Sequence, residues 1–411
     1  MPGRARARHG NGLITDLSPS TGTKTMTSLP FPVSEFDARL ERTQASMRKA
    51  ELDALVLTTP ANFRYFTGLD SQFWESPTRP WFLVIPASGP TIAIVPAIAE
   101  VVVKQCVAGS VRTWPSPRPE DEGVSLLASV VNDLARRFGK VGFELGREFA
   151  LRMPVLDFLR LRDLLTSEAV DGSPCIWEVR NIKSRAEIEK IRQAGQIVSR
   201  SFASVPEFAK LGVTEAQASR DLTVDILLRG AHTVPYVACA SGPGGYDQII
   251  ARGSRRELRD GDVLIIDVGA TIDGYFCDFD RNYAVGKISD DARRVHDAVW
   301  VATEVGINAA RAGTKVRDLW KAMMEVLEGA GMRGNSVGRL GHGLGLQVTE
   351  PPSNSAADEA VLEPGMVITI EPGMEYEPGK MIVHEENITI TEDGFADVLT
   401  VRAPREMWAI N

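Results

Sequence analysis

Two aspartates lie in apolar, strand-like segments that a turn could fold together. Asp267 and Asp278 occupy the two halves of VLIIDVGATIDGYFCDFD, and the Asp273-Gly274 pair between them is typical of a hairpin turn. Folding back at that turn would bring both carboxylates to one face of a sheet. Carboxylates in apolar strands are costly to bury unless they are paired or bind a cation. The pattern therefore favours a cation-binding hairpin over two ordinary solvated aspartates.

Three further candidate ligands lie downstream. His342 stands between glycines in GHGLG, Glu371 occurs in TIEPGM, and Glu385 occurs in VHEEN. Taken alone, the histidine is better explained by a structural role. Four carboxylates and one imidazole together would form an oxygen-rich site suited to Mn, Fe, Co or Zn rather than to a soft metal. Because two divalent ions would balance four negative charges, we expect two cations here, with manganese as the first choice.

The motifs that contain these residues resemble, in the same order, those of the M24 family, the pita-bread-fold metallopeptidases. The metal positions of that family match Asp267, Asp278, His342, Glu371 and Glu385 within DVGATIDGYFCDFDR, GHGLG, TIEPGM and HEENITIT. The N-terminal segment and the linker EVRNIKS further resemble the prolidase, aminopeptidase P and creatinase branch. The resemblance implies a homodimeric hydrolase that cleaves the bond of a small peptide or small-molecule amide, as Xaa-Pro dipeptidases and aminopeptidases do.

The same resemblance implies a role for each ligand. Asp267 would hold one ion, Asp278 and Glu385 would bridge the two, and His342 and Glu371 would hold the other. A hydroxide that bridges the ions would be the nucleophile, because the cations lower the pKa of water. Glu371 would also carry the proton from that nucleophile to the leaving amine. The second catalytic candidate is Glu350, which remains from the family's His-Glu-x-Pro pattern.

Two substrate-contacting histidines of that branch are absent from this chain. One normally lies in a loop resembling ASGPGGYDQIIARG, where Tyr246 is a candidate, although a solvated loop explains Tyr246 equally well. The other normally stands at the position held by Thr349. Asp280 replaces the threonine of the family's Asp-x-Thr-Arg and adds a carboxylate near the metals, and Val383 replaces an arginine often found two residues before the last ligand. We take Tyr246, Thr349 and Asp280 as substrate-binding candidates.

These departures leave three hypotheses about function. The first is a metal-dependent hydrolase, which the retained ligand set favours. The second is another M24 enzyme, either an amidohydrolase of small metabolites or a lyase of the dimethylsulfoniopropionate type, in which a carboxylate base starts a β-elimination without the missing histidines. The third is a non-catalytic binding module, which we rank last because such proteins typically lose their metal ligands.

Alternating strands and helices precede the metal motifs. We predict a helix capped by Ser34, buried strands in DALVLTT, WFLVIP, TIAIVP and KVGFEL, and helices within residues 122–138 and 149–165. Together they predict an α/β domain over residues 32–170. The polar residues 166–174 are predicted to form a loop at the domain boundary.

Beyond that boundary the pattern becomes α+β. Helices are predicted in EVRNIKSRAEIEKIRQAGQIV and over residues 214–229 and 290–312. Strands are predicted in VLIIDVGATIDGYFCDFDRNYAVG, MVITIEPGMEY and MIVHEENITIT. The predicted fold class is therefore α+β, with a C-terminal pita-bread domain over residues 171–411 and a smaller N-terminal creatinase-like α/β domain.

Length and composition agree with a two-domain globular protein. The chain has 411 residues, of which 44% are hydrophobic and 24% charged. A formal charge of −8 disfavours nucleic acid as a partner, the apolar stretches are too short for a membrane span, and the four cysteines form no CxxC pair. We expect a cytoplasmic protein in which residues 1–31 form a disordered tail or translation starts at Met26.

Overall fold

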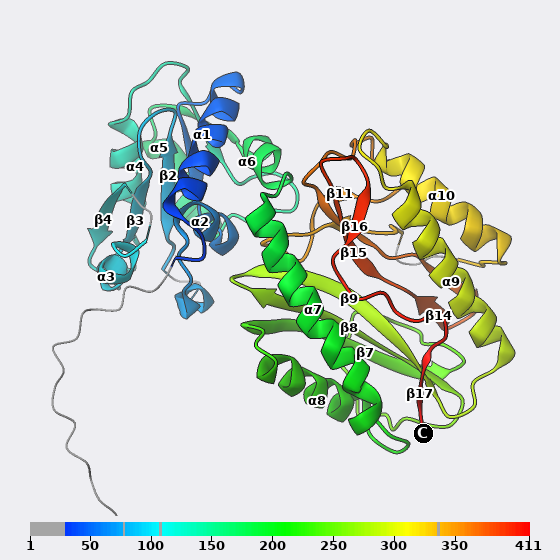
Figure 1. Ribbon diagram of the computed structural model, residues 1–411. Helices are drawn as coiled ribbons and strands as arrows, with labels where there is room; N and C mark the ends of the chain where they lie inside the picture. The colour runs from blue at the N-terminus through cyan, green and yellow to red at the C-terminus, as the bar shows by residue number, and fades with distance from the viewer. Residues whose placement is uncertain (1–28, 77–78, 107–108, 335–337) are drawn as a thin grey trace, which may run out of the picture.

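The computed structural model describes residues 29–76, 79–106, 109–334 and 338–411, and Figure 1 shows two domains, with a long helix at the start of the C-terminal one. Most of the predicted tail lies outside the described residues. Its last residue, Phe31, is buried and packs edge-on against Phe36 and Tyr275. Phe31 therefore belongs to the core, and the prediction of a tail up to this residue was wrong.

The N-terminal domain is built around a mixed six-stranded sheet. Its strand order is β4-β3-β2-β1-β5-β6, with β1 antiparallel to β2 and parallel to β5. Alternate residues of the central strands enter two apolar clusters, one on each face, so the sheet is buried on both sides. The strands are β1 (Ala54–Leu57), β2 (Phe82–Pro86), β3 (Ile92–Pro96), β4 (Ser110–Trp114), β5 (Lys140–Phe143) and β6 (Glu168–Asp171).

Helices cover both faces of this sheet (Figure 1). The first of them starts at Val33, and Pro32 rather than the predicted Ser34 occupies its cap position. The helices are α1 (Val33–Lys49), α2 (Pro60–Thr67), α3 (Glu100–Val103), α4 (Val124–Asn132) and α5 (Val155–Leu164), with short 3-10 turns η1 (Gln72–Glu75) and η2 (Ala97–Ala99).

The segment predicted to be a boundary loop is structured. Residues 168–171 form β6, which pairs in parallel with β5, and α6 (Ser173–Arg180) follows at once. The loop prediction was therefore wrong, because pairing with a distant strand decides the conformation of this polar edge segment. The domain boundary that was predicted between residues 170 and 171 stays a prediction.

A helix break separates α6 from the long α7 (Arg185–Phe208). Ser184 caps α7, since its hydroxyl accepts from the backbone N–H of Glu187 while the Glu187 carboxylate accepts from the N–H of Ser184. The next helix, α8 (Glu215–Leu228), is capped by Thr214. In Figure 1 these two helices lie against the four-stranded sheet of the C-terminal domain.

That sheet has the order β17-β9-β8-β7, and apolar residues of β8 alternate between its two faces. Leu264 and Ile266 pack with α7 and α8, whereas Val263 and Ile265 face the core shared with the helices on the other side. Asp267 lies two residues after Ile265 and therefore on the same face of the sheet. Its side chain points into the space between this sheet and the layer that faces it. The elements are β7 (Thr233–Pro243), β8 (Asp262–Ile272), β9 (Tyr275–Val285), β17 (Trp408–Ile410), α9 (Asp290–Ala309) and α10 (Val316–Gly329).

The opposing layer is a five-stranded sheet of order β11-β10-β12-β15-β16 with a separate β13-β14 hairpin. The sequence patterns predicted α9 and the strands β8, β9, β12, β13, β14 and β15. They did not predict α10, β7, β10, β11, β16 or β17. Among the described residues, no helix is both long and apolar enough to cross a membrane. The predicted α+β class is confirmed. The strands are β10 (His342–Gly343), β11 (Glu350–Ser353), β12 (Val367–Ile370), β13 (Gly373–Glu377), β14 (Lys380–Val383), β15 (Glu386–Ile390) and β16 (Ala396–Val398).

Candidate metal centre

The β8–β9 hairpin brings the two aspartates together as predicted. Asp273 and Gly274 form its turn with φ values of 50° and 82°, the left-handed pair that two-residue hairpins favour. In the register of the hairpin, Gly269 lies opposite Asp278, and Asp267 lies two residues away on the same face. Both carboxylates therefore point toward the opposing layer.

That layer supplies the imidazole. The β10 strand pairs with β12, and the backbone N–H of His342 donates to Thr369 Oγ1 at 3.1 Å. His342 Nδ1 lies 2.9 Å from the carbonyl oxygen of Gly343. Because a carbonyl only accepts, Nδ1 carries the proton, and the lone pair of Nε2 is left to face Asp278 Oδ2 at 3.5 Å and Glu371 Oε1 at 3.7 Å.

Glycines are required on both sides of this histidine. Gly341 has a φ of 141°, and a Cβ there would lie 2.2 Å from the carbonyl oxygen of Thr369. A Cβ on Gly343 would lie 2.0 Å from the carbonyl oxygen of Pro351. The GHGLG motif therefore allows β10 to approach its neighbours closely enough to aim the imidazole.

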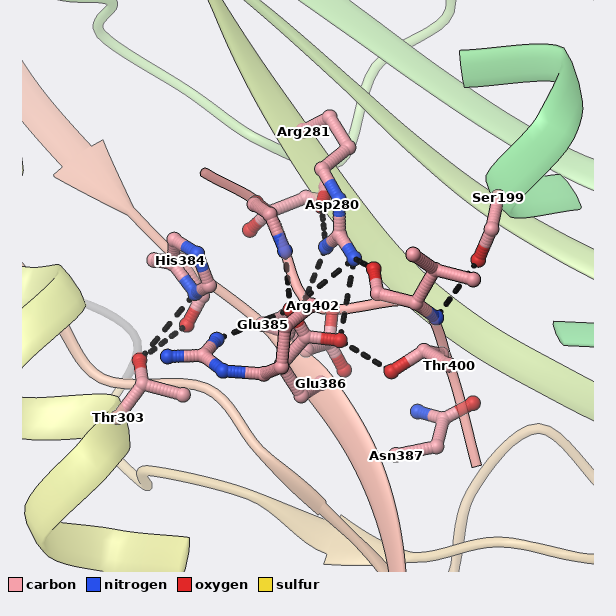
Figure 2. A network of polar contacts seen from close by, with 12 residues as sticks. Ser199, Asp280, Arg281, Thr303, His384, Glu385, Glu386, Asn387, Thr400 and Arg402 are labelled. Carbon is pink, nitrogen blue, oxygen red and sulfur yellow. Dashed lines mark hydrogen bonds and ion pairs between the residues drawn. The ribbon is translucent and has the colours of Figure 1, made fainter. Parts of the chain in front are cut away.

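Glu385 is held between β14 and β15 by a buried polar network (Figure 2). Arg281 Nη1 donates to the carbonyl oxygen of Glu385 at 2.9 Å, and Arg281 Nη2 donates to the Glu386 carboxylate at 3.1 Å. Asn387 ties the same strand to β9, since its Oδ1 accepts from the backbone N–H of Asp278 at 3.0 Å. These contacts fix the backbone of Glu385 and leave its side chain free to face Asp278.

The carboxylates brought together in this way have buried oxygen atoms that accept no hydrogen bond from the protein. Ligand atoms of Asp278, His342 and Glu385 all lie within 4.8 Å of one another. Unpartnered buried oxygens are costly, and carboxylate clusters of this kind are stable when a cation pairs with them. The donor set therefore fits divalent metal. Among the described residues, the buried oxygens of this cluster without a hydrogen-bond partner are Asp267 Oδ1, Asp278 Oδ1, Glu371 Oε1 and Glu385 Oε1.

The electrostatics of the cluster agree with this fit. Burial, followed by the charge of Asp278, raises the pKa of Asp267 to about 8, although the Tyr236 hydroxyl donates to Asp267 Oδ2 at 2.7 Å. Burial also raises the pKa of Asp278 to about 8 and that of Glu371 to about 7. The pKa of Glu385 lies well above its usual range because of burial and the neighbouring carboxylates. Without a counter-charge, this site favours bound protons.

Asp280 lies at the same cluster. It stands directly opposite Asp267 in the β8–β9 register and is buried, and burial and the charge of Asp267 raise its pKa well above the usual range. Asn282 Nδ2 lies 3.5 Å from Asp280 Oδ1. The structure therefore brings Asp280 beside the five predicted ligands.

Tyr246 does not reach the cluster. Its ring is buried, and its hydroxyl donates to Asn282 Oδ1 at 3.1 Å and accepts from the backbone N–H of Val383 at 2.7 Å. Both hydrogen-bonding roles of the hydroxyl are therefore taken by protein groups. This geometry does not favour the predicted substrate contact by the hydroxyl, and it links Tyr246 to Asp280 through Asn282.

Thr349 lies at the edge of a cleft between the domains. The cleft has a volume of about 940 Å³ and is lined by residues from both domains, among them Trp74, Arg152, Phe276 and Thr349. Its walls are mostly apolar, with a few charged groups. The structure thus places Thr349 at a cavity large enough for a small ligand.

The second catalytic candidate, Glu350, lies in a different environment. It is buried and forms ion pairs with Arg180 and with Lys183 Nζ, the latter at 2.9 Å, while the backbone N–H of Gln347 donates to Oε1 at 3.2 Å. Burial by itself would raise the pKa of Glu350, but the two cations outweigh it and lower the pKa. The contacts hold this carboxylate as an anion at the domain junction, which does not favour the predicted catalytic role.

Sequence reasoning missed several residues around the cluster. Tyr236, which donates to Asp267, lies on β7, and the alternating TVPYVACA segment could have revealed that strand. Arg339, whose Nε lies 3.8 Å from Glu371 Oε1, carries no local pattern that would have marked it. Asn387 could have been noticed only as a polar residue in an otherwise apolar strand.

Comparison with known proteins places both domains. Residues 189–392 match the metallopeptidase family M24, and residues 39–182 match the creatinase/prolidase N-terminal domain. The probable dipeptidase PepE of Mycobacterium tuberculosis is 32% identical over 379 residues, which cover 91% of this chain and 96% of that protein.

Solved structures agree with this assignment. Dipeptidase PepE from Mycobacterium ulcerans has a TM-score of 0.80 at 31% identity and covers 92% of this chain and 99% of its own. Recombinant prolidase from Thermococcus sibiricus has a TM-score of 0.81 at 28% identity, with 91% and 99% covered. The two matched domains, their order and the pita-bread fold of the catalytic one together show that this chain is a metallohydrolase that belongs to metallopeptidase family M24.

Proposed function

We propose that this protein is a dinuclear metal-dependent peptidase that cleaves small peptides, dipeptides first among them. The observation that carries the proposal is the group of four buried carboxylate oxygens without partners around the free Nε2 of His342. The relatives support the substrate class, since the similar proteins include a probable dipeptidase from Mycobacterium tuberculosis and an Xaa-Pro dipeptidase from Bacillus anthracis, the latter 25% identical with a TM-score of 0.78.

In this proposal five side chains hold two divalent cations, with manganese as the first choice. Asp267, Asp278, His342, Glu371 and Glu385 are the side chains that would hold these ions. When bound, the cations lower the pKa of a water molecule and polarise the scissile carbonyl group. Iron, cobalt and zinc fit the same oxygen-rich donor set.

The residues of the chain then have distinct tasks. Tyr236 fixes the orientation of Asp267 through its hydroxyl, and the contact of His342 Nδ1 with the Gly343 carbonyl turns Nε2 toward Asp278 and Glu371. Glu371 is partly exposed at the rim, and its Oε1 has no hydrogen-bond partner. We assign to Glu371 the transfer of a proton from the attacking water to the leaving amine.

We further infer that Thr349 and Asp280 shape the substrate side of the centre. Thr349 lines the cleft between the domains, and Asp280 adds negative charge beside Asp267. Tyr246 acts through Asn282 in this proposal, and Glu350 anchors the domain junction through Arg180. Neither of these last two side chains touches the substrate.

The resemblance to the prolidase branch also underlies three finer proposals. We propose a homodimer, manganese as the resident metal and the cytoplasm as the compartment. Size-exclusion chromatography with light scattering tests the first, and metal analysis of protein purified without added metal tests the second. Fractionation of cells that express the chain tests the third.

The proposed reaction is tested by assay of the metal-loaded protein. The protein is freed of metal, reloaded with Mn, Fe, Co or Zn, and offered Ala-Pro, Ala-Leu, small N-acyl amino acids and dimethylsulfoniopropionate. Release of free amino acids from the dipeptides, lost with a chelator and restored with metal, supports the proposal. Turnover of only the N-acyl compounds would instead indicate an amidohydrolase, and turnover of only dimethylsulfoniopropionate would indicate a lyase. The similar proteins give no support for either alternative.

A further inference from the structure

The side chains of the metal centre come from two separate layers. Asp267 and Asp278 lie on the four-stranded sheet, whereas His342 lies on the five-stranded sheet and Glu385 directly precedes its strand β15. Within the part of the chain that the structure describes, no backbone ladder joins these two sheets. Neither sheet by itself therefore fixes the distance between the two groups of ligands, and side chains have to do so.

Asn387 makes such a link at Asp278. Its side-chain oxygen accepts from the backbone N–H of Asp278 at 3.0 Å, and its side-chain nitrogen donates to the backbone carbonyl of the same residue. Opposite residues of antiparallel strands exchange the same pair of bonds. Among the described residues, β17 pairs with β9 only at residues 283–285, so no strand serves Asp278 on the edge of β9 away from β8. The carboxamide of Asn387 takes the place of that strand.

The segment that carries Asn387 is itself firmly held. Asn387 is fully buried, β15 pairs with β12 and β16, and the carbonyl oxygen of Asn387 accepts from the N–H of Leu399 at 2.9 Å. Glu385 lies two residues earlier, and ligand atoms of Glu385 and Asp278 lie within 4.8 Å of each other. One short segment therefore faces the Asp278 carboxylate through Glu385 and holds the Asp278 backbone through Asn387 (Figure 2).

This double contact opposes the repulsion between the two carboxylates. Like charges so close together in a buried site repel strongly, and their repulsion pushes the two layers apart at the cluster. The hydrogen bonds of Asn387 resist that movement. Because they use only backbone atoms of Asp278, they leave both of its carboxylate oxygens available to cations.

We propose that Asn387 is a positioning residue that holds the Asp278 carboxylate beside Glu385 and thereby lets the chain retain a second divalent ion. The inference rests on the dinuclear centre of the proposed function and adds the residue that fixes its two halves. A single ion can draw a displaced ligand toward itself, whereas two neighbouring cations repel each other and need ligands that are already in place. Residues that orient metal ligands typically contribute about tenfold to a hundredfold in metal affinity.

The experiment counts metal ions in variants of matched size. Asn387→Leu removes both hydrogen bonds at nearly constant volume, and Asn387→Gln moves the carboxamide by one methylene. Thr389→Val is the matched control, because Thr389 is buried on the same strand and its hydroxyl donates to the Met366 carbonyl at 3.1 Å instead of to Asp278. Each protein is freed of metal and titrated with manganese. Bound ions per chain, the electron paramagnetic resonance signal of coupled manganese pairs and the thermal midpoint in chelator are measured.

The wild type should bind two coupled manganese ions. Asn387→Leu should bind the first ion almost as tightly as the wild type but the second about tenfold or more weakly, and the coupled signal should return at higher manganese. Asn387→Gln should fall between the two, and this result is required even if Asn387→Leu does not fold. Thr389→Val should keep the coupled pair although its thermal midpoint falls.

Two results would overturn the inference. One is a coupled pair of wild-type affinity in Asn387→Leu or, should that variant not fold, in Asn387→Gln. The other is an equal loss of the second ion in Thr389→Val, as expected if destabilisation alone were the cause. A wild type that binds a single ion would overturn both the inference and the dinuclear centre. A wild type that binds the coupled pair but cleaves no dipeptide would refute the peptidase proposal alone, and the metal titrations would still decide the role of Asn387.

Discussion

Asp267 and Asp280 lie directly opposite each other across the β8–β9 ladder, and both carboxylates are on the face that also carries Asp278. Like charges at such positions repel across antiparallel strands. The neighbouring Arg281 relieves them only in part: its charge lowers the pKa of Asp280, but its guanidinium pairs with Glu386, and the pKa of Asp280 stays well above the usual range. A stretch of three acidic residues on one hairpin face is stable only with bound protons or bound cations.

This arrangement predicts how the stability of the metal-free protein depends on pH. The pKa of Asp267 and that of Asp278 rise from an ordinary value of 3.8 to about 8 on folding. At pH values between these two pKa values, the folded chain holds protons that the unfolded chain has released. The free energy of unfolding therefore falls as the pH rises through this range. The stabilisation is complete below the lower value and lost above about pH 8.

Urea unfolding in the presence of a chelator, followed from about pH 5 to about pH 9, measures this slope. Added manganese should abolish or reverse the slope, because metal ligands bind in their deprotonated form. A metal-free protein that grows more stable between neutral and alkaline pH would contradict the proposed electrostatics.

Asp278→Asn should separate metal binding from stability. The variant loses a bridging ligand, so the content of bound metal should fall, while the thermal midpoint of the metal-free protein at alkaline pH should rise because one buried charge has been removed. Calorimetry with and without a chelator measures both effects. Asp290→Asn is the control, since Asp290 is fully exposed at the start of α9, and it should change neither quantity.

Glu371→Gln tests the proton-transfer role. The amide cannot accept a proton, so kcat should fall by about a hundredfold or more, the usual size of a general acid–base contribution. The assay uses the best-cleaved dipeptide at saturating metal, and metal content is measured on the same samples. Glu363→Gln, at an exposed position ahead of β12, should keep the wild-type rate. A Glu371→Gln variant that binds metal and keeps its full rate would remove Glu371 from the mechanism.

Glu350→Gln should act on stability first. The change leaves Arg180 and Lys183 buried without their anionic partner, and loss of one member of a buried ion pair costs about 3–5 kcal/mol. Chemical unfolding of the metal-loaded protein measures this cost. In the exposed pair of Lys315 with Glu359, the change Glu359→Gln should have little effect. A fully stable but inactive Glu350→Gln variant would restore the catalytic role that the sequence pattern suggested.

The local signals in the sequence were sufficient for the β8–β9 hairpin. Asp273 and Gly274 specify the turn, and the period-two alternation of β8 fixes the face on which Asp267 lies. The strand β6 was mistaken for a loop because its residues, EAVD, have no apolar alternation, and only pairing with β5 makes them a strand. Local composition carries no information about such a partner.

The surroundings of the site were also beyond sequence reasoning. Glu350 kept its place in a family motif, but its partners Arg180 and Lys183 lie far away along the chain, so the motif could not reveal that the carboxylate is neutralised at a domain junction. Arg339 reaches Thr349 only because the chain returns from β10 to β11. Contacts between residues distant in sequence decide which polar side chains remain available for chemistry.

The tip of the β8–β9 hairpin rests against the N-terminal domain. A Cβ on Gly274 would lie 1.9 Å from Arg64 Nη1, and Asp273 pairs with Lys190 of α7 at 2.7 Å. The strands that meet at this tip also carry Asp267 and Asp278. Exchanging the N-terminal domain for that of a relative would therefore disturb the positions of the metal ligands unless the hairpin were exchanged with it. The two domains have to evolve as a matched pair.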